Sequence, residues 1–195
     1  MITIVDYDTG NIQSVKNAFR RIGADYIVSS DPQEIAMAER IFLPGVGEMS
    51  SAMAKLRERG LVDVLRESRV PVLGICLGMQ LMCRYGQEGG GVEGIGIFDN
   101  EVSKMSGDAL LKVPHVGWNT ITNLSSALFC GVKEGSYLYY VHSFAANINK
   151  NTIAITDYGS SFSASLCRDN FFGCQFHPEK SGEVGEQILK NFIRL

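Results

Sequence analysis

Val70-Pro-Val-Leu-Gly-Ile-Cys-Leu-Gly-Met-Gln80 is the stretch of sequence that decides the fold. Its apolar first half predicts a buried strand, and its second half predicts a helix that starts directly after Cys76. Gly74 and Gly78 each lie two residues from the cysteine. Small neighbours let the backbone bend sharply and present one side chain at the end of a strand. This is the geometry of a nucleophile turn.

Before this stretch, short apolar segments alternate with segments of helical spacing. Strands are predicted at residues 2–7, 26–29 and 40–43, and a fourth at 70–75. Such alternation predicts a mostly parallel sheet that is covered by helices on both faces. Ligands bind beyond the carboxyl ends of the strands in sheets of this kind. We therefore expect the turn at 8–11, the loop at 44–47 and Cys76 to share one rim.

After residue 87 the pattern changes. A Gly-rich segment at 88–91 predicts a flexible loop, and the helix behind Cys76 is expected to run from Leu77 to about Tyr85. Later apolar segments predict short strands with tight turns, mostly antiparallel, and 182–195 predicts a closing helix. We expect one domain over residues 1–195, an α/β fold with an open, mixed, mostly parallel sheet flanked by helices. Antiparallel strands are added to it in the second half.

Composition excludes several classes of protein. The 195 residues are 45% hydrophobic and 20% charged, with a net charge of −3, which favours a packed core and no nucleic-acid partner. The cysteines are odd in number, five, and form no CxxC pair, which indicates reduced thiols and a cytoplasmic location. The first residues do not resemble a signal peptide, and no apolar run is long enough for a membrane span.

Cys76 is the candidate nucleophile. A thiol reacts as its thiolate, and the N-terminus of the following helix favours the anion. Free backbone N–H groups there, notably that of Leu77, can receive an oxyanion. The alternative is that Cys76 is an inert buried cysteine. We interpret the other cysteines in that way: Cys83, Cys130, Cys167 and Cys174.

His177 is the candidate base, in the segment Gln175-Phe-His-Pro-Glu179. Residues two apart in extended chain point the same way, so Glu179 can accept the imidazole N–H and orient the ring. A surface corner with no catalytic role is the alternative reading of His-Pro-Glu. The histidines are far apart and no phosphate-binding loop is present, so we expect no metal and no cofactor.

Three motifs resemble those of the triad-type class I glutamine amidotransferases, in the same order along the chain. They are Pro44-Gly-Val-Gly47, Gly74-Ile-Cys-Leu-Gly-Met-Gln80 and Phe176-His-Pro-Glu179. Within that family the chain is most similar to the glutaminase subunits of imidazole glycerol phosphate synthases, enzymes of histidine biosynthesis. The segments that carry this likeness include Pro114-His-Val-Gly-Trp-Asn119 and Tyr139-Tyr-Val-His-Ser143.

The resemblance implies hydrolysis of L-glutamine to glutamate and ammonia. Cys76 is then the nucleophile, His177 the acid and base, and Glu179 the residue that orients it. Backbone N–H groups of Leu77 and of the loop near Val46 form the oxyanion hole. The implied substrate-binding residues are Gly47, Gln80, Glu88, Ser143 and Phe144. On the residues alone, Gln80 could merely form the pocket wall and Glu88 could simply be solvated.

The resemblance also implies a partner, a (β/α)8-barrel cyclase subunit that receives ammonia in a heterodimer and makes imidazole glycerol phosphate. Asn11, Trp118, Tyr139 and Lys180 match positions near that contact, although Trp118 could instead pack in the core. Three other readings remain open. They are the same glutaminase with a different acceptor enzyme, a degenerate regulatory module, and a stand-alone thiol hydrolase.

Overall fold

A computed structural model of the chain describes residues 1–9, 11–107 and 111–195, so Gly10 of the predicted turn lies outside it. The helices are α1 (Ile12–Arg21), α2 (Pro32–Ala36), α3 (Met49–Glu58), α4 (Leu61–Arg66), α5 (Leu77–Met82) and α6 (Gly182–Arg194). The 3₁₀ turns are η1 (Glu88–Gly90), η2 (Ala127–Phe129) and η3 (Pro178–Lys180). The strands are β1 (Ile2–Val5), β2 (Tyr26–Ser29), β3 (Arg40–Leu43), β4 (Val72–Ile75), β5 (Cys83–Gly86), β6 (Val92–Glu93), β7 (Phe98–Lys104), β8 (His115–Thr120), β9 (Tyr137–His142), β10 (Phe144–Ala146), β11 (Thr152–Tyr158), β12 (Ser160–Arg168) and β13 (Phe171–Cys174).

The central sheet has seven strands in the order β11-β12-β13-β4-β3-β1-β2. From β13 to β2 every neighbouring pair is parallel, whereas β12 pairs antiparallel with both β11 and β13. A four-stranded sheet, β10-β7-β5-β6, and the antiparallel pair β8-β9 complete the fold. The expected mixed, mostly parallel α/β sheet with later antiparallel additions is confirmed.

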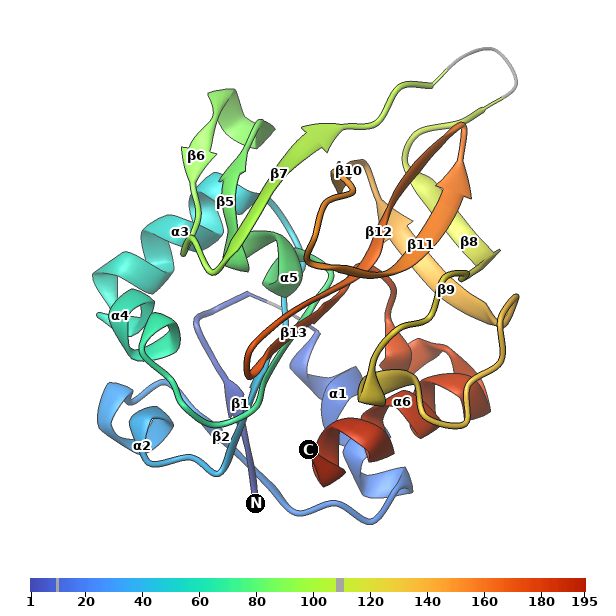
Figure 1. The fold of residues 1–195 in the computed structure, drawn as a ribbon. Helices are drawn as coiled ribbons and strands as arrows, with labels where there is room; N and C mark the ends of the chain where they lie inside the picture. Colours follow the sequence, from blue (N-terminus) through green and yellow to red (C-terminus); the bar gives the residue numbers. More distant parts are fainter. Residues whose placement is uncertain (10, 108–110) are drawn as a thin grey trace.

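Helices cover both faces of the central sheet (Figure 1), with α1 and α6 on one face and α2, α3 and α4 on the other. Successive side chains of a strand point to opposite faces, and β1 shows the result. Ile4 belongs to the same hydrophobic cluster as Phe19 of α1 and Leu189 of α6, whereas the next residue, Val5, belongs to the cluster that contains Met53 of α3. None of the helices within the described ranges is both long and apolar enough to cross a membrane.

The helix behind Cys76 is shorter than predicted. It ends at Met82, because Cys83 takes extended backbone angles (φ −69°, ψ 166°) and begins β5, which pairs in parallel with β7. The predicted end near Tyr85 is therefore wrong. A short apolar run has the same spacing in a buried helix and in a buried strand, so periodicity cannot separate the two.

Two glycines let β3, β4 and α5 approach one another closely at the nucleophile turn. A Cβ atom on Gly78 would lie 2.0 Å from the carbonyl oxygen of Leu43 at the end of β3, and a Cβ atom on Gly74 would lie 2.6 Å from the carbonyl oxygen of Gly78. Both obstacles are backbone atoms, which cannot rotate away. The sequence therefore needs glycine here for close packing of backbone against backbone.

Gly78→Ala is expected to lower the free energy of unfolding by about 3 kcal/mol, because the new methyl group must push α5 away from β3. Urea unfolding of wild type and variant measures the loss. Gly23→Ala is the matched control, since that glycine has φ +69° but open space around it and so incurs only backbone strain of about 1–2 kcal/mol. A smaller loss at Gly78 than at Gly23 would contradict the packing argument.

Candidate active site

Cys76 lies between β4 and α5 with φ 53° and ψ −110°, a conformation that non-glycine residues rarely adopt. Its backbone N–H donates to the carbonyl of Cys174 at 2.7 Å, which ties the turn to the neighbouring strand β13. The side chain is mostly buried. Its Sγ lies 3.8 Å from the carbonyl oxygen of Val141 and 3.6 Å from Nε2 of Gln175.

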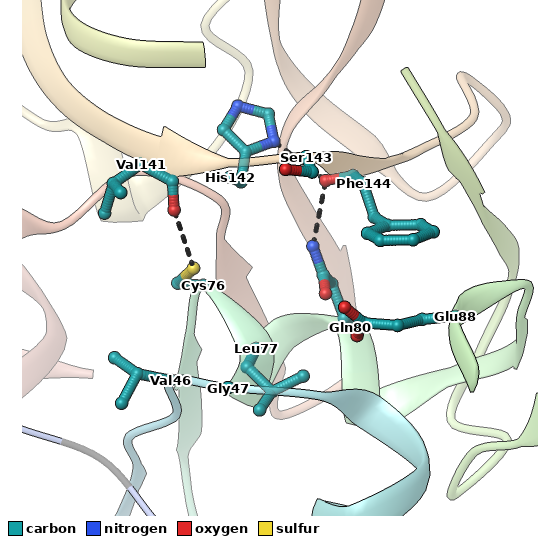
Figure 2. Close-up of a pocket in the computed structure, with 10 residues that line it drawn as sticks. All are labelled: Val46, Gly47, Cys76, Leu77, Gln80, Glu88, Val141, His142, Ser143 and Phe144. Carbon is teal, nitrogen blue, oxygen red and sulfur yellow. Dashed lines mark hydrogen bonds between the residues drawn. The ribbon is translucent and has the colours of Figure 1, made fainter. Parts of the chain in front are cut away.

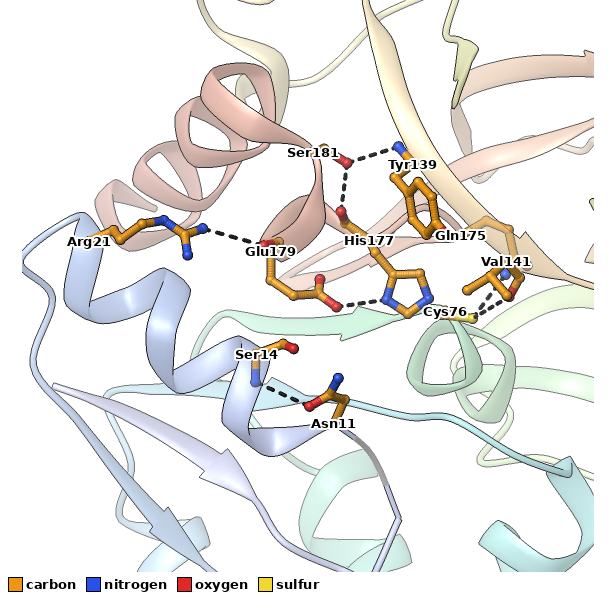
Figure 3. Close-up of polar contacts among 10 residues, drawn as sticks. All are labelled: Asn11, Ser14, Arg21, Cys76, Tyr139, Val141, Gln175, His177, Glu179 and Ser181. Carbon is orange, nitrogen blue, oxygen red and sulfur yellow. Dashed lines mark hydrogen bonds and ion pairs between the residues drawn. The ribbon is translucent and has the colours of Figure 1, made fainter. Parts of the chain in front are cut away.

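His177 and Glu179 are in contact beside this cysteine (Figure 3). The Nδ1 of His177 lies 2.7 Å from Oε1 of Glu179, and both side chains are buried. The backbone around them is held on two sides: the N–H of His177 donates to the carbonyl of Tyr139 at 2.8 Å, and the Ser181 hydroxyl donates to the carbonyl of His177 at 2.6 Å. The carboxylate thus selects the tautomer and orientation of the imidazole.

The other ring nitrogen of His177 is buried and has no hydrogen-bond partner among the described residues; Figure 3 shows it on the side of Cys76. Burial lowers the pKa of His177, but Cys76 and Glu179 more than offset burial and raise that pKa to about 10. The site therefore favours a protonated imidazole beside the Cys76 sulfur. A cysteine and a histidine placed in this way can attack a carbonyl carbon and then protonate a leaving group.

A cavity of about 270 Å³ opens next to the Cys76 sulfur (Figure 2). The cavity brings together eight predicted site residues: the nucleophile, the two oxyanion-hole residues and the five substrate-binding residues. It is lined by Val46, Gly47, Cys76, Leu77, Gln80, Glu88, Val141, His142, Ser143 and Phe144. Val141 and His142 were not predicted as site residues; as neighbours of Ser143 in the same strand segment, they could have been.

Glu88 is half-buried and is not simply solvated. Its Oε2 accepts a hydrogen bond from the backbone N–H of Met49, the first residue of α3, at 2.7 Å. Burial raises the pKa of Glu88, and the hydrogen bond from Met49 counteracts this effect. The carboxylate thus closes one end of the cavity, where a cationic group of a ligand would stabilise its charged form.

Gln80 is buried and forms part of the cavity wall. Its Nε2 donates to the carbonyl of Phe144 at 3.0 Å and to Oε1 of Gln175 at 2.9 Å. Both amide hydrogens are therefore used within the protein, and Oε1 remains to accept from a ligand. Gln175 itself was not predicted as a site residue. It lies two residues before His177, and side chains two apart in extended chain point to the same side.

The candidate oxyanion donors lie on the opposite side of Cys76 from Val141 (Figure 2). Leu77 is the first residue of α5, and N–H groups in the first turn of a helix have no partner within the helix. Val46 belongs to the loop between β3 and α3, followed by Gly47 with φ +106°. The Tyr7 hydroxyl donates to the carbonyl of Pro44 at 2.7 Å and anchors the start of that loop.

Comparison with known proteins decides the family. Residues 3–195 match the model of the family described as glutamine amidotransferase class-I. The chain belongs to the class I glutamine amidotransferases. It is 47% identical to a protein of Bacteroides fragilis named "Imidazole glycerol phosphate synthase subunit HisH", over all of this chain and 99% of that protein. It is 46% identical, with the same coverage, to the Escherichia coli K12 protein of the same name.

Solved structures agree on the amidotransferase fold. One is described as a glutamine amidotransferase; it has a TM-score of 0.76 and 14% identity and covers all of this chain and 98% of its own. Another, PurLQS from Thermotoga maritima, has a TM-score of 0.68 and 19% identity, with 99% of this chain and 97% of that chain covered. At such low identity the likeness concerns the fold alone.

Three of the four predicted partner residues of this amidotransferase gather around β9. Trp118 is 55% exposed and packs edge-on against Tyr139, with ring centroids 6.0 Å apart, so the alternative of core packing for Trp118 is wrong. The Lys180 ammonium lies over the Tyr139 ring at 5.8 Å. Asn11 has a structural role that was not predicted: its side-chain oxygen caps α1 by accepting from the N–H of Ser14 at 3.2 Å.

The remaining cysteines of the amidotransferase differ more than expected. Cys83 and Cys174 are buried, and burial raises the pKa of both thiols, that of Cys174 to about 12. These two fit the prediction of inert, buried thiols. Cys167 is only half-buried and Cys130 is exposed, so the prediction of burial is wrong for Cys130.

His115 and His142 form a buried pair of which His142 lines the cavity, with Nδ1 of His115 and Nε2 of His142 3.0 Å apart. The Nδ1 of His142 lies 2.8 Å from the carbonyl oxygen of Phe144, and Nε2 of His115 lies 3.3 Å from Nδ2 of Asn119. A carbonyl only accepts and an amide nitrogen only donates, so every proton position in this chain is determined when both rings are neutral. Burial lowers the pKa of each histidine to about 4.

This pair is expected to make the amidotransferase less stable in mild acid. Its folded pKa values lie below the usual 6.5, so the unfolded chain binds more protons, and the free energy of unfolding falls as pH drops from 6.5 toward 4. Each unit of pKa difference is worth about 1.4 kcal/mol. Urea unfolding between pH 7 and 5 measures the slope, and His115→Gln/His142→Gln should flatten it. An equal slope in that variant would contradict the assignment.

Proposed function

We propose that the chain hydrolyses L-glutamine to L-glutamate and ammonia, as the glutaminase subunit of an imidazole glycerol phosphate synthase. The observation that carries the proposal is the Cys76–His177–Glu179 arrangement beside a cavity that has a carboxylate at its far end. Full-length identity of 47% to a named subunit of that synthase supports the choice of pathway. Residues 1–195 then form one glutamine amidotransferase domain.

The reaction proceeds in two halves. His177 takes the thiol proton, and the Cys76 sulfur attacks the side-chain amide carbon of glutamine to form a tetrahedral oxyanion. His177 returns the proton to the amide nitrogen, ammonia leaves, and a γ-glutamyl thioester remains on Cys76. His177 then removes a proton from water, which attacks the thioester, and the sulfur leaves with that proton as glutamate is released. Glu179 holds the imidazole throughout and stabilises its charged form.

The oxyanion is received by backbone N–H groups. Leu77 offers one at the start of α5, where the helix dipole also favours negative charge. The loop around Val46 supplies the second. Gly47 beside it permits the loop to change its backbone angles at low cost, because glycine occupies positive φ readily. We propose that this loop completes the oxyanion hole only after the partner subunit binds.

The α-amino and α-carboxylate groups of glutamine bind at the end of the cavity away from the sulfur. Glu88 and the free Oε1 of Gln80 both present acceptors there, and Figure 2 shows the two side chains side by side. Two acceptors, one of them anionic, suit an ammonium group. The backbone of Ser143 and Phe144, together with Gly47, forms the remaining contacts with the amino-acid end.

The partner binds on the outer face of β8 and β9. Alternate residues of this pair point outward, and the exposed side chains include Val116 (56%), Trp118 (55%), Tyr137 (60%) and Val141 (36%). Exposed apolar and aromatic side chains in one place are typical of a protein interface. Val141 also lines the cavity, so the interface and the glutamine site are contiguous. We propose a (β/α)8-barrel cyclase subunit as the partner, which receives ammonia in a cytoplasmic heterodimer.

Isotope transfer tests this function. The chain is mixed with the histidine-pathway cyclase subunit, its nucleotide substrate, glutamine labelled with ¹⁵N in the amide group and an excess of unlabelled ammonium. We expect imidazole glycerol phosphate to carry mostly ¹⁵N, because ammonia passes between the subunits without mixing with solvent. Labelled ammonium in solution without imidazole glycerol phosphate would indicate a stand-alone hydrolase or a different acceptor enzyme, and would contradict the proposal.

A further inference from the structure

The side chain of Gln175 lies between the candidate nucleophile and the wall of the cavity. It is completely buried and does not line the cavity itself. Its Oε1 accepts from Nε2 of Gln80 at 2.9 Å. Its Nε2 lies 3.6 Å from the Sγ of Cys76, as Figure 3 shows. Its backbone N–H donates to the carbonyl of Ala164 at 2.8 Å, which holds the residue against β12.

The direction of these hydrogen bonds is determined by one backbone carbonyl. The carbonyl oxygen of Phe144 can only accept, so Gln80 must present its nitrogen to it, at 3.0 Å. The same nitrogen carries the second hydrogen toward Gln175, which must therefore present its oxygen to Gln80. The nitrogen of Gln175 is then the atom that faces the sulfur. Gln175 consequently presents a donor to the Cys76 sulfur, while the carbonyl oxygen of Val141 lies 3.8 Å from the same sulfur.

A second chain of hydrogen bonds ends at the same carbonyl. The Nδ1 of His142 lies 2.8 Å from the Phe144 oxygen, and because a carbonyl oxygen only accepts, His142 donates from that atom. Both lone pairs of the carbonyl are thus occupied. The Phe144 oxygen therefore cannot accept a further hydrogen bond. Its bond from Gln80 determines the amide orientation of Gln80 and, through Gln80, that of Gln175.

We propose that Gln175 is a positioning residue for Cys76, whose side-chain N–H donates to the sulfur and holds the thiolate in line with the cavity. The inference rests on the proposed function, because it assigns a further role within the same site. A donor next to a sulfur atom favours its anionic form, whereas an acceptor there disfavours it. His177 and Tyr7 are titratable groups that also interact electrostatically with Cys76, and both remain in place in the variants below.

The test is the pH dependence of Cys76 alkylation by iodoacetamide in the full chain, with the modified peptide quantified by mass spectrometry. Gln175→Glu keeps the length of the side chain and the acceptor for Gln80, but it presents an oxygen to the sulfur. We expect the midpoint of its alkylation profile to move to higher pH by about one unit, which makes the reaction about tenfold slower at pH values well below both midpoints. Gln175→Met, which has neither donor nor acceptor, should move the midpoint by less.

Two controls separate this role from general damage. Gln187→Met replaces a glutamine on α6 that is hydrogen-bonded to Asn191, and it should leave the Cys76 profile unchanged. Alkylation of the exposed Cys130, measured in every sample, is the internal reference for the reactivity of the reagent at each pH. With the partner present, Gln175→Glu should lower kcat for glutamine hydrolysis about tenfold and change KM less than about twofold, since Gln175 does not touch the cavity.

A Cys76 profile in Gln175→Glu that coincides with wild type would overturn the proposal. Alkylation requires neither glutamine nor the cyclase, so this result is independent of whether the chain is a glutaminase. Absence of glutamine hydrolysis by the wild-type complex would overturn the proposed function instead.

Discussion

Replacing Cys76 with alanine is expected to abolish glutamine-dependent synthesis by the complex with its cyclase subunit, lowering the rate by at least about 10³-fold. Without the sulfur no thioester can form. Water would have to attack the amide of glutamine directly, which is a much slower reaction. Synthesis from added ammonium salt should stay within about twofold of wild type, because ammonia then reaches the cyclase without the glutaminase. Both rates are measured as imidazole glycerol phosphate formed per unit time.

The matched control is Cys130→Ala, which removes an exposed thiol from the C-cap of η2. It should leave glutamine-dependent and ammonium-dependent synthesis unchanged. If Cys76→Ala loses both activities, the variant has damaged the assembly and not only the chemistry. If it keeps both, another residue is the nucleophile. Either outcome contradicts the division of labour between the subunits.

Adding the cyclase subunit with its nucleotide ligand is expected to raise the glutaminase rate of this chain by about 10²-fold or more. One oxyanion donor is worth about that factor, and the proposed second donor belongs to the exposed second half of the loop between β3 and α3. Val46 is 41% exposed, and no atom would lie within 4 Å of a Cβ on Gly47. Glutamate release is measured for the isolated chain, for the chain with cyclase, and for the chain with cyclase and nucleotide.

Trp118→Ala should weaken this activation about tenfold, because Trp118 is a large exposed anchor on the proposed docking face and does not touch the triad. Met37→Ala is the matched control: Met37 is 79% exposed but follows α2, at the C-cap of that helix. The cyclase with its nucleotide should activate the Met37→Ala variant as strongly as it activates the wild-type chain. Full glutaminase activity in the isolated chain would contradict the idea that the oxyanion hole is completed by the partner.

Much of the fold follows from local patterns. Short apolar runs alternate with helical spacing up to Cys76, and the physical requirement to cover both faces of a parallel sheet leads directly to four of the five parallel strands, β1 to β4, with helices on both faces. The fifth, β13, lies among the later strands expected to be mostly antiparallel, yet it pairs in parallel with β4. The end of α5 could not be predicted in the same way. Whether Cys83 continues a helix or begins a strand is decided by its partner in β7, which is far along the chain.

In the candidate site, too, contacts between residues close in sequence were predicted and contacts between distant residues were not. Residues close in sequence were readily paired: His177 and Glu179 are two apart, and their side chains are in contact at 2.7 Å. The extended backbone expected between them is wrong, because Pro178 and Glu179 lie in the 3₁₀ turn η3 and only His177 is extended. Gln175 was overlooked because its partners, Cys76 and Gln80, are nearly a hundred residues away. No local pattern indicates that a buried amide will find a sulfur atom.

The sequence by itself determined the nucleophile turn at Cys76, the His-Pro-Glu corner and the order of strands and helices, because sterics and periodicity act over a few residues. Only the tertiary structure decided which atoms surround the sulfur. It placed the carbonyl of Val141 and the amide of Gln175 next to Cys76, and it turned Trp118 outward and His115 inward on the same strand. These outcomes depend on the pairing of distant strands, and their energies come from burial and hydrogen bonding that exist only after the chain has folded.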